Sequence, residues 1–183
     1  LSVIIATRDR PEALKELLAQ LATQETHGEF TYEVVVADNA PTTEQTREAV
    51  QGLQPTFPVS LRYVREPRLG KPWALNTGIE HARGAMLAFT DDDVVPTSTW
   101  LWGLWRCFTE ERSDAVTGRV LPRWLGERPA WLTDEAFWAI GGMGCIDWGP
   151  RRLSTREGHD CRWVGGNASI RREVIDRLGG FDI

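Results

Sequence analysis

The 183 residues are 42% hydrophobic and 26% charged, which is typical of one globular domain of ordinary size. The 21 Lys and Arg and 26 Asp and Glu give a formal net charge of −5 without a basic run, which disfavours binding to nucleic acid through phosphates. The uncharged stretches are too short and too polar for a bilayer, so we expect no transmembrane segment. Three cysteines without a closely spaced pair favour a reducing compartment, and hence a cytoplasmic location.

The first 120 residues alternate predicted strands and helices. Apolar, β-branched runs predict strands at Ser2–Ala6, Glu33–Ala37, Leu61–Val64 and Ala85–Thr90. Apolar periodicity and turn residues predict helices from Pro11 to Leu21, near Thr43–Leu53, from Pro72 to about Ala82, and from an N-cap at Ser98 to about Arg112. Strands joined by helices of this length form right-handed crossover units, so we predict an α/β fold with a mainly parallel central sheet flanked by helices.

The regular pattern ends after about Val120. Residues 121–168 are rich in Gly, Pro, Trp and Arg and show no clear period, which indicates a loop-dominated, functional stretch. Within it, Cys161–Val164 is predicted to return to the sheet as a strand. Arg171–Leu178 is predicted to form a short helix that stops at two glycines. We find no repeat and no linker, so we expect one domain.

Three consecutive carboxylates, Asp91, Asp92 and Asp93, follow the fourth predicted strand. In parallel sheets ligands bind beyond the carboxyl ends of the strands. Carboxylate oxygens are ligands that suit Mg²⁺ or Mn²⁺, and such a metal usually completes its shell with waters and substrate phosphates. The alternative is a solvated acidic turn before the next helix.

Asp38 follows the second predicted strand in the same way. Its carboxylate could accept the imide N–H of uracil or thymine, or the ring N–H of guanine; the alternative is an ordinary turn. Arg65, Arg68 and Lys71 place cations at a loop and helix start, where anions bind, although surface charge would also explain them. The glycine-rich loops of dehydrogenases and P-loop enzymes and the hydrolase nucleophile elbow are absent.

Five segments occur in order, and together they resemble glycosyltransferase family 2, which has the GT-A fold: SVIIATRDRPEALKELLAQL, VVVADNAPT, EPRLGKPWALNTGI, AFTDDDVVP and WVGGNASIRREVIDRLGGFD. The resemblance runs from Ser2 to Ile183 and is weakest across 121–160. It implies a single GT-A domain over 1–183, with a nucleotide-binding half at 1–120 and a loop-rich acceptor-side half at 121–183. It also implies that the C-terminal part of the family's domain is truncated or missing.

The resemblance assigns roles by position. The residues it implies for the nucleotide are Thr7, Arg8, Asp38, Arg68, Lys71, Asp91 and Asp92. It implies Asp91 and Asp93 as the acids of a DxD-type motif that holds Mn²⁺ or Mg²⁺, although three adjacent aspartates leave the register open. On the acceptor side it implies Trp163, Gly165, Gly166 and Asn167.

The resemblance implies metal-assisted transfer of a sugar, with inversion, from a nucleotide-sugar to an acceptor hydroxyl. Asp38 favours UDP- or dTDP-sugars, and the acceptor is expected to be a carbohydrate or a lipid-linked molecule. A lipid-linked acceptor would bring the protein to the cytoplasmic face of a membrane as a peripheral protein. The Trp-rich second half suits this chemistry, because sugar C–H faces stack on aromatic rings.

The catalytic base of the resembled family belongs to a Glu-Asp pair shortly after the Gly-Gly-Phe-Asp block, which here is Gly179 to Asp182. The 183 residues contain no Glu-Asp pair, so we expect the base after Ile183. Two alternatives stay open. One is a haloacid-dehalogenase-like Mg-dependent phosphatase that uses DDDVV, and the other is a catalytically incomplete nucleotide-sugar binding domain.

Overall fold

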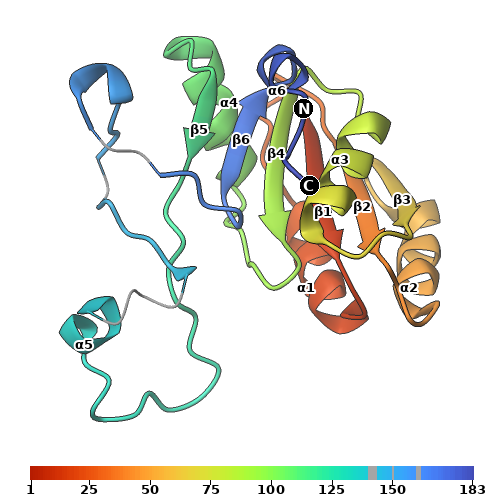
Figure 1. Ribbon diagram of the computed structural model, residues 1–183, viewed down its shortest axis with the longest axis horizontal. Helices are drawn as coiled ribbons and strands as arrows, with labels where there is room; N and C mark the ends of the chain where they lie inside the picture. The colour runs from red at the N-terminus through yellow and green to blue at the C-terminus, as the bar shows by residue number, and fades with distance from the viewer. Residues whose placement is uncertain (140–143, 150, 160–161) are drawn as a thin grey trace.

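The computed structural model describes residues 1–139, 144–149, 151–159 and 162–183. In this part of the chain a six-stranded sheet has the order β3-β2-β1-β4-β6-β5 (Figure 1). The parallel strands are β1 (Ser2–Thr7), β2 (Glu33–Asn39), β3 (Ser60–Glu66) and β4 (Met86–Asp91). The sheet is completed by β6 (Ala168–Arg171), antiparallel to β4, and β5 (Ala115–Thr117), antiparallel to β6.

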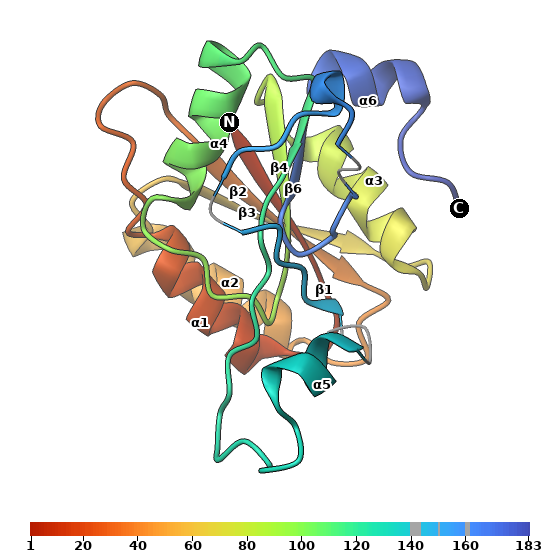
Figure 2. The same ribbon diagram turned by 90° about the vertical axis from the view of Figure 1, so that its left-hand side faces the viewer.

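Helices cover both faces of the sheet (Figure 2). On one face lie α1 (Pro11–Leu21), α2 (Gln45–Leu53) and α4 (Trp100–Glu110). On the other lie α3 (Lys71–His81) and α6 (Arg172–Leu178). Short elements are η1 (Gln54–Thr56), α5 (Asp134–Ala139) and η3 (Thr155–Glu157).

The continuous apolar runs of β1 and β2 reflect this double cover. Side chains alternate across a strand, so Val3 and Ile5 pack into the cluster beneath α1, whereas Ile4 packs into the cluster beneath α3. A strand buried on both faces has one continuous hydrophobic run, which is the pattern from which these strands were predicted. The prediction of a mainly parallel α/β sheet is confirmed.

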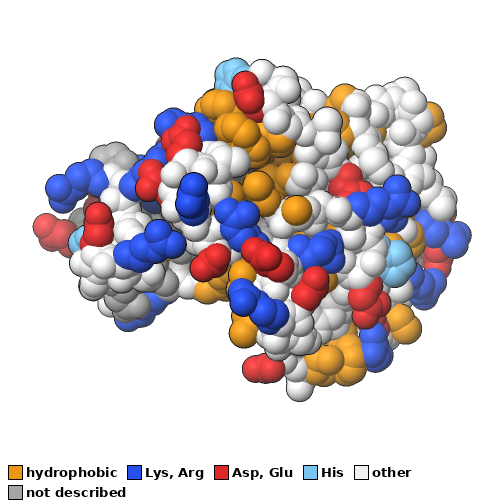
Figure 3. Space-filling model, turned by 90° about the horizontal axis from the view of Figure 1, so that it is seen from above, with side chains coloured by type: hydrophobic (Ala, Val, Ile, Leu, Met, Phe, Trp, Pro, Cys, Tyr) orange, Lys and Arg blue, Asp and Glu red, His pale blue; other side chains and the backbone are white. Residues whose placement is uncertain are grey.

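The end of the molecule opposite the carboxyl ends of the parallel strands is seen in Figure 3. Acidic and basic side chains are interspersed there around a hydrophobic area. In the part of the chain that the structure describes, no helix is both long enough and apolar enough to cross a membrane.

Local predictions in the second half needed correction. Cys161–Val164 was predicted as a strand, but Arg162 to Val164 belong to none and Cys161 lies outside the described residues. The strand that joins the sheet is β6, seven residues later, where Ala168 pairs with Phe89 of β4. Strands of three and four residues such as β5 and β6 have too few positions for a periodic signal, so partner pairing decides them.

Helix boundaries also differ slightly. The predicted N-cap Ser98 is wrong: Thr99 occupies that position, and the Ser98 hydroxyl donates instead to Glu25 Oε1 at 2.5 Å. The short helix after β6 begins at Arg172 and ends, as predicted, at a left-handed Gly179. A long connection between β5 and β6 extends away from the sheet, on the left of Figure 1. This connection contains α5.

Candidate functional site

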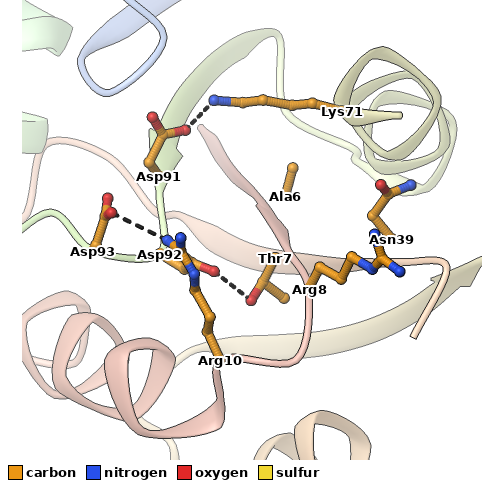
Figure 4. Close-up of a pocket in the computed structure, with 9 residues that line it drawn as sticks. All are labelled: Ala6, Thr7, Arg8, Arg10, Asn39, Lys71, Asp91, Asp92 and Asp93. Carbon is orange, nitrogen blue, oxygen red and sulfur yellow. Dashed lines mark hydrogen bonds and ion pairs between the residues drawn. The ribbon is translucent and has the colours of Figure 1, made fainter. Parts of the chain in front are cut away.

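A pocket of about 350 Å³ opens at the carboxyl ends of the central strands (Figure 4). It is lined by Ala6, Thr7, Arg8, Arg10, Asn39, Lys71, Asp91, Asp92 and Asp93. These residues come from the ends of β1, β2 and β4 and the start of α3. The structure therefore brings together five of the seven residues that the sequence implied for a nucleotide.

The three carboxylates of the triplet have different environments. Asp92 turns towards the α1 side and is only 5% exposed, because its carboxylate accepts hydrogen bonds from Thr7 Oγ1 at 2.7 Å and Arg10 Nη1 at 3.2 Å. The same Arg10 nitrogen lies 3.2 Å from Asp93 Oδ2. Neutralisation by Arg10 allows adjacent carboxylates to share one turn.

Asp91 points the other way, towards α3, where the ammonium of Lys71 is its partner. Lys71 is the first residue of α3 and follows Gly70, whose φ of +136° is readily adopted only by glycine. A lysine at a helix N-terminus is well placed to hold an anion, because the helix dipole and exposed N–H groups add to its charge.

A second cavity of about 860 Å³ adjoins the first and shares Lys71, Asp91 and Asp93 with it, whereas Asp92 does not line it. Asp91 and Asp93 therefore lie at the junction of two cavities. Their hard oxygens suit Mn²⁺ or Mg²⁺ held by two carboxylates, with phosphates and water as the other ligands. Among the described residues no group of three or more His, Cys, Asp and Glu side chains gathers as a metal site.

Gly165, Gly166 and Asn167 line the second cavity, and their assignment to the acceptor stays a prediction. A Cβ on Gly165 would lie 3.3 Å from Lys71 Nζ, so glycine allows the close approach. The Asn167 amide is used within the fold: its oxygen accepts from Trp100 Nε1 at 2.9 Å and its nitrogen donates to the Arg119 carbonyl at 3.0 Å. Asn167 thus shapes the wall.

Trp163 does not line either cavity. Its ring is 42% exposed and lies 6.1 Å, centroid to centroid, from the ring of Phe89 on β4. Its assignment to the acceptor side stays a prediction.

Arg68 also lies outside the lining of both cavities. Its Nε and Nη2 donate to the two oxygens of buried Glu66, both at 2.7 Å, and its guanidinium stacks 3.6 Å over the Trp73 ring. Hydrogen bonds from Arg68, together with one from Thr77, lower the pKa of Glu66 to about 2. Of the two cations proposed for the family's basic position, Lys71 is the one that lines the pocket.

Asp38 is fully buried at the end of β2, next to Thr7 in register, and does not line the pocket. Its Oδ2 accepts a hydrogen bond from Tyr63 on β3 at 2.9 Å, whereas Oδ1 has no hydrogen-bond partner. Burial raises the pKa of Asp38. Its assignment to the nucleobase stays a prediction.

Two lining residues, Arg10 and Asn39, had no role assigned from the sequence. Arg10 precedes α1 and neutralises two of the three aspartates. Asn39 donates to the Arg68 carbonyl at 2.7 Å and accepts from Gly70 N at 3.0 Å, so it fixes the loop that leads into α3. Both residues stand just after predicted strands, and this position is the signal that could have identified them.

Comparison with known proteins agrees with this geometry. A family model described as glycosyl transferase family 2 matches residues 2–179, so the chain belongs to glycosyl transferase family 2 and has its GT-A fold. A glucosyl-dolichyl phosphate glucuronosyltransferase of Haloferax volcanii is 26% identical over 191 residues, which cover 99% of this chain and 55% of that protein.

Solved structures show the same likeness. The mannosyltransferase PcManGT from Pyrobaculum calidifontis, in complex with GDP-Man and Mn²⁺, matches with a TM-score of 0.71 and 26% identity over 99% of this chain and 47% of its own. TarS 1-349 of S. aureus with UDP-GlcNAc matches at 0.63 and 20% identity over 99% of this chain and 48% of its own, a likeness of fold. The chain spans about half the length of these relatives.

The phosphatase alternative is not supported. DDDVV begins at the last residue of β4, the fourth strand in chain order, whereas the phosphatase motif would follow the first strand. The matched family is one of glycosyl transferases.

Proposed function

We propose that this chain forms the donor side of a metal-assisted, inverting glycosyltransferase. The observation that carries the proposal is the position of Lys71, Asp91 and Asp93 at the junction of the two cavities. A nucleoside diphosphate in the smaller cavity would place its sugar at this junction, facing the larger one. The family membership and the nucleotide-sugar complexes of PcManGT and TarS support a nucleotide-sugar as the donor.

The leaving group in this reaction is a nucleoside diphosphate, whose phosphates gain negative charge as the bond to the sugar breaks. A divalent ion held by Asp91 and Asp93 would stabilise that charge. Lys71 would bind a phosphate oxygen from the start of α3, exchanging its contact with Asp91 for one with the substrate. Asp92 keeps Thr7 and Arg10 in place on the opposite side.

We propose uridine or thymidine diphosphate as the donor nucleotide, because a carboxylate such as Asp38 accepts one imide N–H. The acceptor would bind in the larger cavity, a carbohydrate or a lipid-linked molecule. Apolar residues in its lining, including Val94, Val95 and Leu121, suit an acceptor with an apolar part. The Haloferax volcanii relative, named for a dolichyl phosphate substrate, supports the lipid-linked alternative.

Calorimetry of nucleotide binding tests the metal and the site together. Uridine diphosphate should bind at least about 10-fold more tightly with Mn²⁺ than with EDTA, since two carboxylates otherwise repel the phosphates. Asp93→Ala should remove this metal dependence and leave folding unchanged, because its side chain is 63% exposed. Asp114→Ala, on the exposed residue before β5, is the control and should retain it. Equal affinity with and without metal would contradict the proposed role of Asp91 and Asp93.

A further inference from the structure

The two oxygens of Asp38 have different environments. Oδ2 accepts from the Tyr63 hydroxyl at 2.9 Å, and Oδ1 is buried without a hydrogen-bond partner. Buried carboxylate oxygens are almost always paired in folded proteins, because an unpaired one gives up hydration without compensation. A donor that arrives with a ligand would pair this oxygen.

Sheet register explains why Tyr63 reaches Asp38. Asp38 pairs with Arg65 on β3 and with Thr7 on β1, and Tyr63 lies two residues before Arg65 on the same face. Thr7 in turn donates to Asp92 in the pocket wall. Asp38 is thus adjacent to two residues that line the pocket, Asn39 on its own strand and Thr7 on β1.

The other charged groups near Asp38 are occupied elsewhere. Asp9 accepts from the N–H and the hydroxyl of Thr42, at 3.0 and 2.8 Å. Arg65 pairs with Glu44 at 3.1 Å. Burial, Asp9 and Glu44 raise the pKa of Asp38, whereas Tyr63 and Arg65 lower it. Burial and the contact with Asp38 raise the pKa of Tyr63, so its hydroxyl remains a donor.

We propose that Tyr63 is a positioning residue that selects the nucleobase, by occupying Asp38 Oδ2 and leaving Oδ1 to accept one ring N–H. The inference rests on the proposed function. Uracil, thymine and guanine carry such an N–H, whereas adenine and cytosine do not. Because Oδ1 is shielded from solvent, neighbouring side chains must move to admit the base. The Arg65–Glu44 pair, about half exposed at both ends, can move with little loss of packing.

The test compares Tyr63→Phe with the wild-type chain by calorimetry with Mn²⁺ and uridine, guanosine or adenosine diphosphate between pH 5 and pH 8.5. The variant should bind the preferred nucleotide roughly 10-fold more weakly and discriminate less against adenosine diphosphate. As the pH is lowered, the affinity of the variant should begin to fall at a higher pH than that of the wild type. The reason is that Asp38 has a higher pKa without the Tyr63 hydrogen bond. A residue that only supported the fold would leave this pH profile in place.

Tyr32→Phe is the matched control. Tyr32 donates to the Leu21 carbonyl at 2.5 Å just before β2, so the variant loses one buried hydrogen bond far from Asp38. Base discrimination and the pH profile should be unchanged in it. Asp38→Asn gives an independent measurement and should lose both the discrimination and the pH dependence.

Three results would overturn the inference. Wild-type discrimination and a wild-type pH profile in Tyr63→Phe would overturn the role of Tyr63 alone. The same behaviour in Asp38→Asn would also overturn the assignment of the nucleobase to Asp38. Failure of the wild-type chain to bind any of the three nucleotides would instead overturn the proposed function, and the inference with it.

Discussion

At the scale of single residues, each acidic side chain that lines the pocket is paired with a basic one. Asp91 has Lys71, and Asp92 and Asp93 share Arg10. Asp91 at the end of β4 turns towards Lys71, whereas Asp92 in the following turn faces Thr7 and Arg10, so their repulsion is weaker than the sequence suggests. The Lys71 side chain is 47% exposed and can exchange Asp91 for an anion, whereas Arg10 is held by the buried Asp92.

Glu66 anchors the loop before α3 and gives a prediction at this scale. Its 2% exposed carboxylate accepts from Arg68 N, Nε and Nη2, all at 2.7 Å, and from Thr77 Oγ1 at 2.5 Å. Glu66→Gln should lower the free energy of unfolding at pH 7 by about 1–3 kcal/mol, since hydrogen bonds to a charged, buried group are lost.

The pH dependence of that loss follows from the pKa of Glu66, which is about 2 in the folded chain against an ordinary 4.5. A depressed pKa contributes stability above pH 4.5 that is lost as the pH falls towards 2. The difference between the wild type and Glu66→Gln should therefore shrink from pH 7 to pH 3 in urea unfolding. Glu29→Gln, at an exposed position, is the control. A difference independent of pH would contradict the assignment.

At the scale of elements, the distance between α3 and the sheet depends on one glycine. A Cβ on Gly78 would lie 2.5 Å from Ile4 Cγ2, a fully buried atom of β1. The absence of a side chain lets α3 approach β1 and places Lys71, at the start of the helix, over the end of β4. The position of Lys71 therefore depends on the packing of Gly78 against Ile4, two turns further along α3.

Two helical glycines allow a matched prediction. Gly78→Ala should lower the free energy of unfolding by about 1–3 kcal/mol, because the added methyl overpacks a rigid contact. Gly103→Ala in α4, where a Cβ would meet no atom within 4 Å, should raise it by about 0.5–1 kcal/mol, because alanine favours the helix. Chemical unfolding of both variants is the measurement. Destabilisation by the two changes to an equal extent would show that α3 does not depend on this close approach.

At the scale of the whole molecule, the two cavities share their acids but differ in their walls. The smaller lies between strand ends and helix starts, and the larger is completed by Arg119 to Arg123, Gly144, Cys145 and Val164 to Asn167. Two acids of the segment between Arg119 and Asn167, Asp147 and Glu157, are poor candidates for a catalytic base. The Asp147 carboxylate is paired with Arg119, whose Nε lies 2.7 Å from Oδ1 and whose Nη2 donates to Oδ2 at 2.9 Å. This contact lowers the pKa of Asp147. Glu157 is exposed, and Asp160 lies outside the described residues.

We therefore expect residues 1–183 to bind nucleotide with metal but to transfer sugar slowly. The rate should lie roughly 10²–10⁴-fold below that of a protein that carries the family's base, as is typical when a general base is missing. Transfer and hydrolysis of a labelled nucleotide-sugar are the measurements. Asp147→Asn and Glu157→Gln should leave the residual rate unchanged.

Three outcomes decide between the alternatives. Full-rate transfer by residues 1–183 would show that the base lies within them. A large fall on changing Asp147 or Glu157 would identify it. Binding without any turnover, also in a longer chain with the family's Glu-Asp pair, would favour the nucleotide-sugar binding domain.

The sequence by itself determined the parallel half of the fold and the place of the acids. Strands buried on both faces read as unbroken apolar runs, and helices with one buried face read at a period of 3.6, so both patterns are local. The triplet at Asp91 was found because it directly follows such a run. The same locality explains why β5 and β6 were missed or misplaced: their few residues become strands only through pairing with β4 and each other.

Only the tertiary structure distinguished the partners of the side chains at the candidate site. Three adjacent aspartates are alike in sequence, but Asp92 is buried against Thr7 and Arg10 and lines one cavity, whereas Asp91 and Asp93 line both. Arg68 and Lys71 are equivalent candidates in the sequence, but in the structure Arg68 is paired with the buried Glu66. These distinctions depend on partners from other strands and helices, and such contacts between distant segments leave no periodic pattern in the chain.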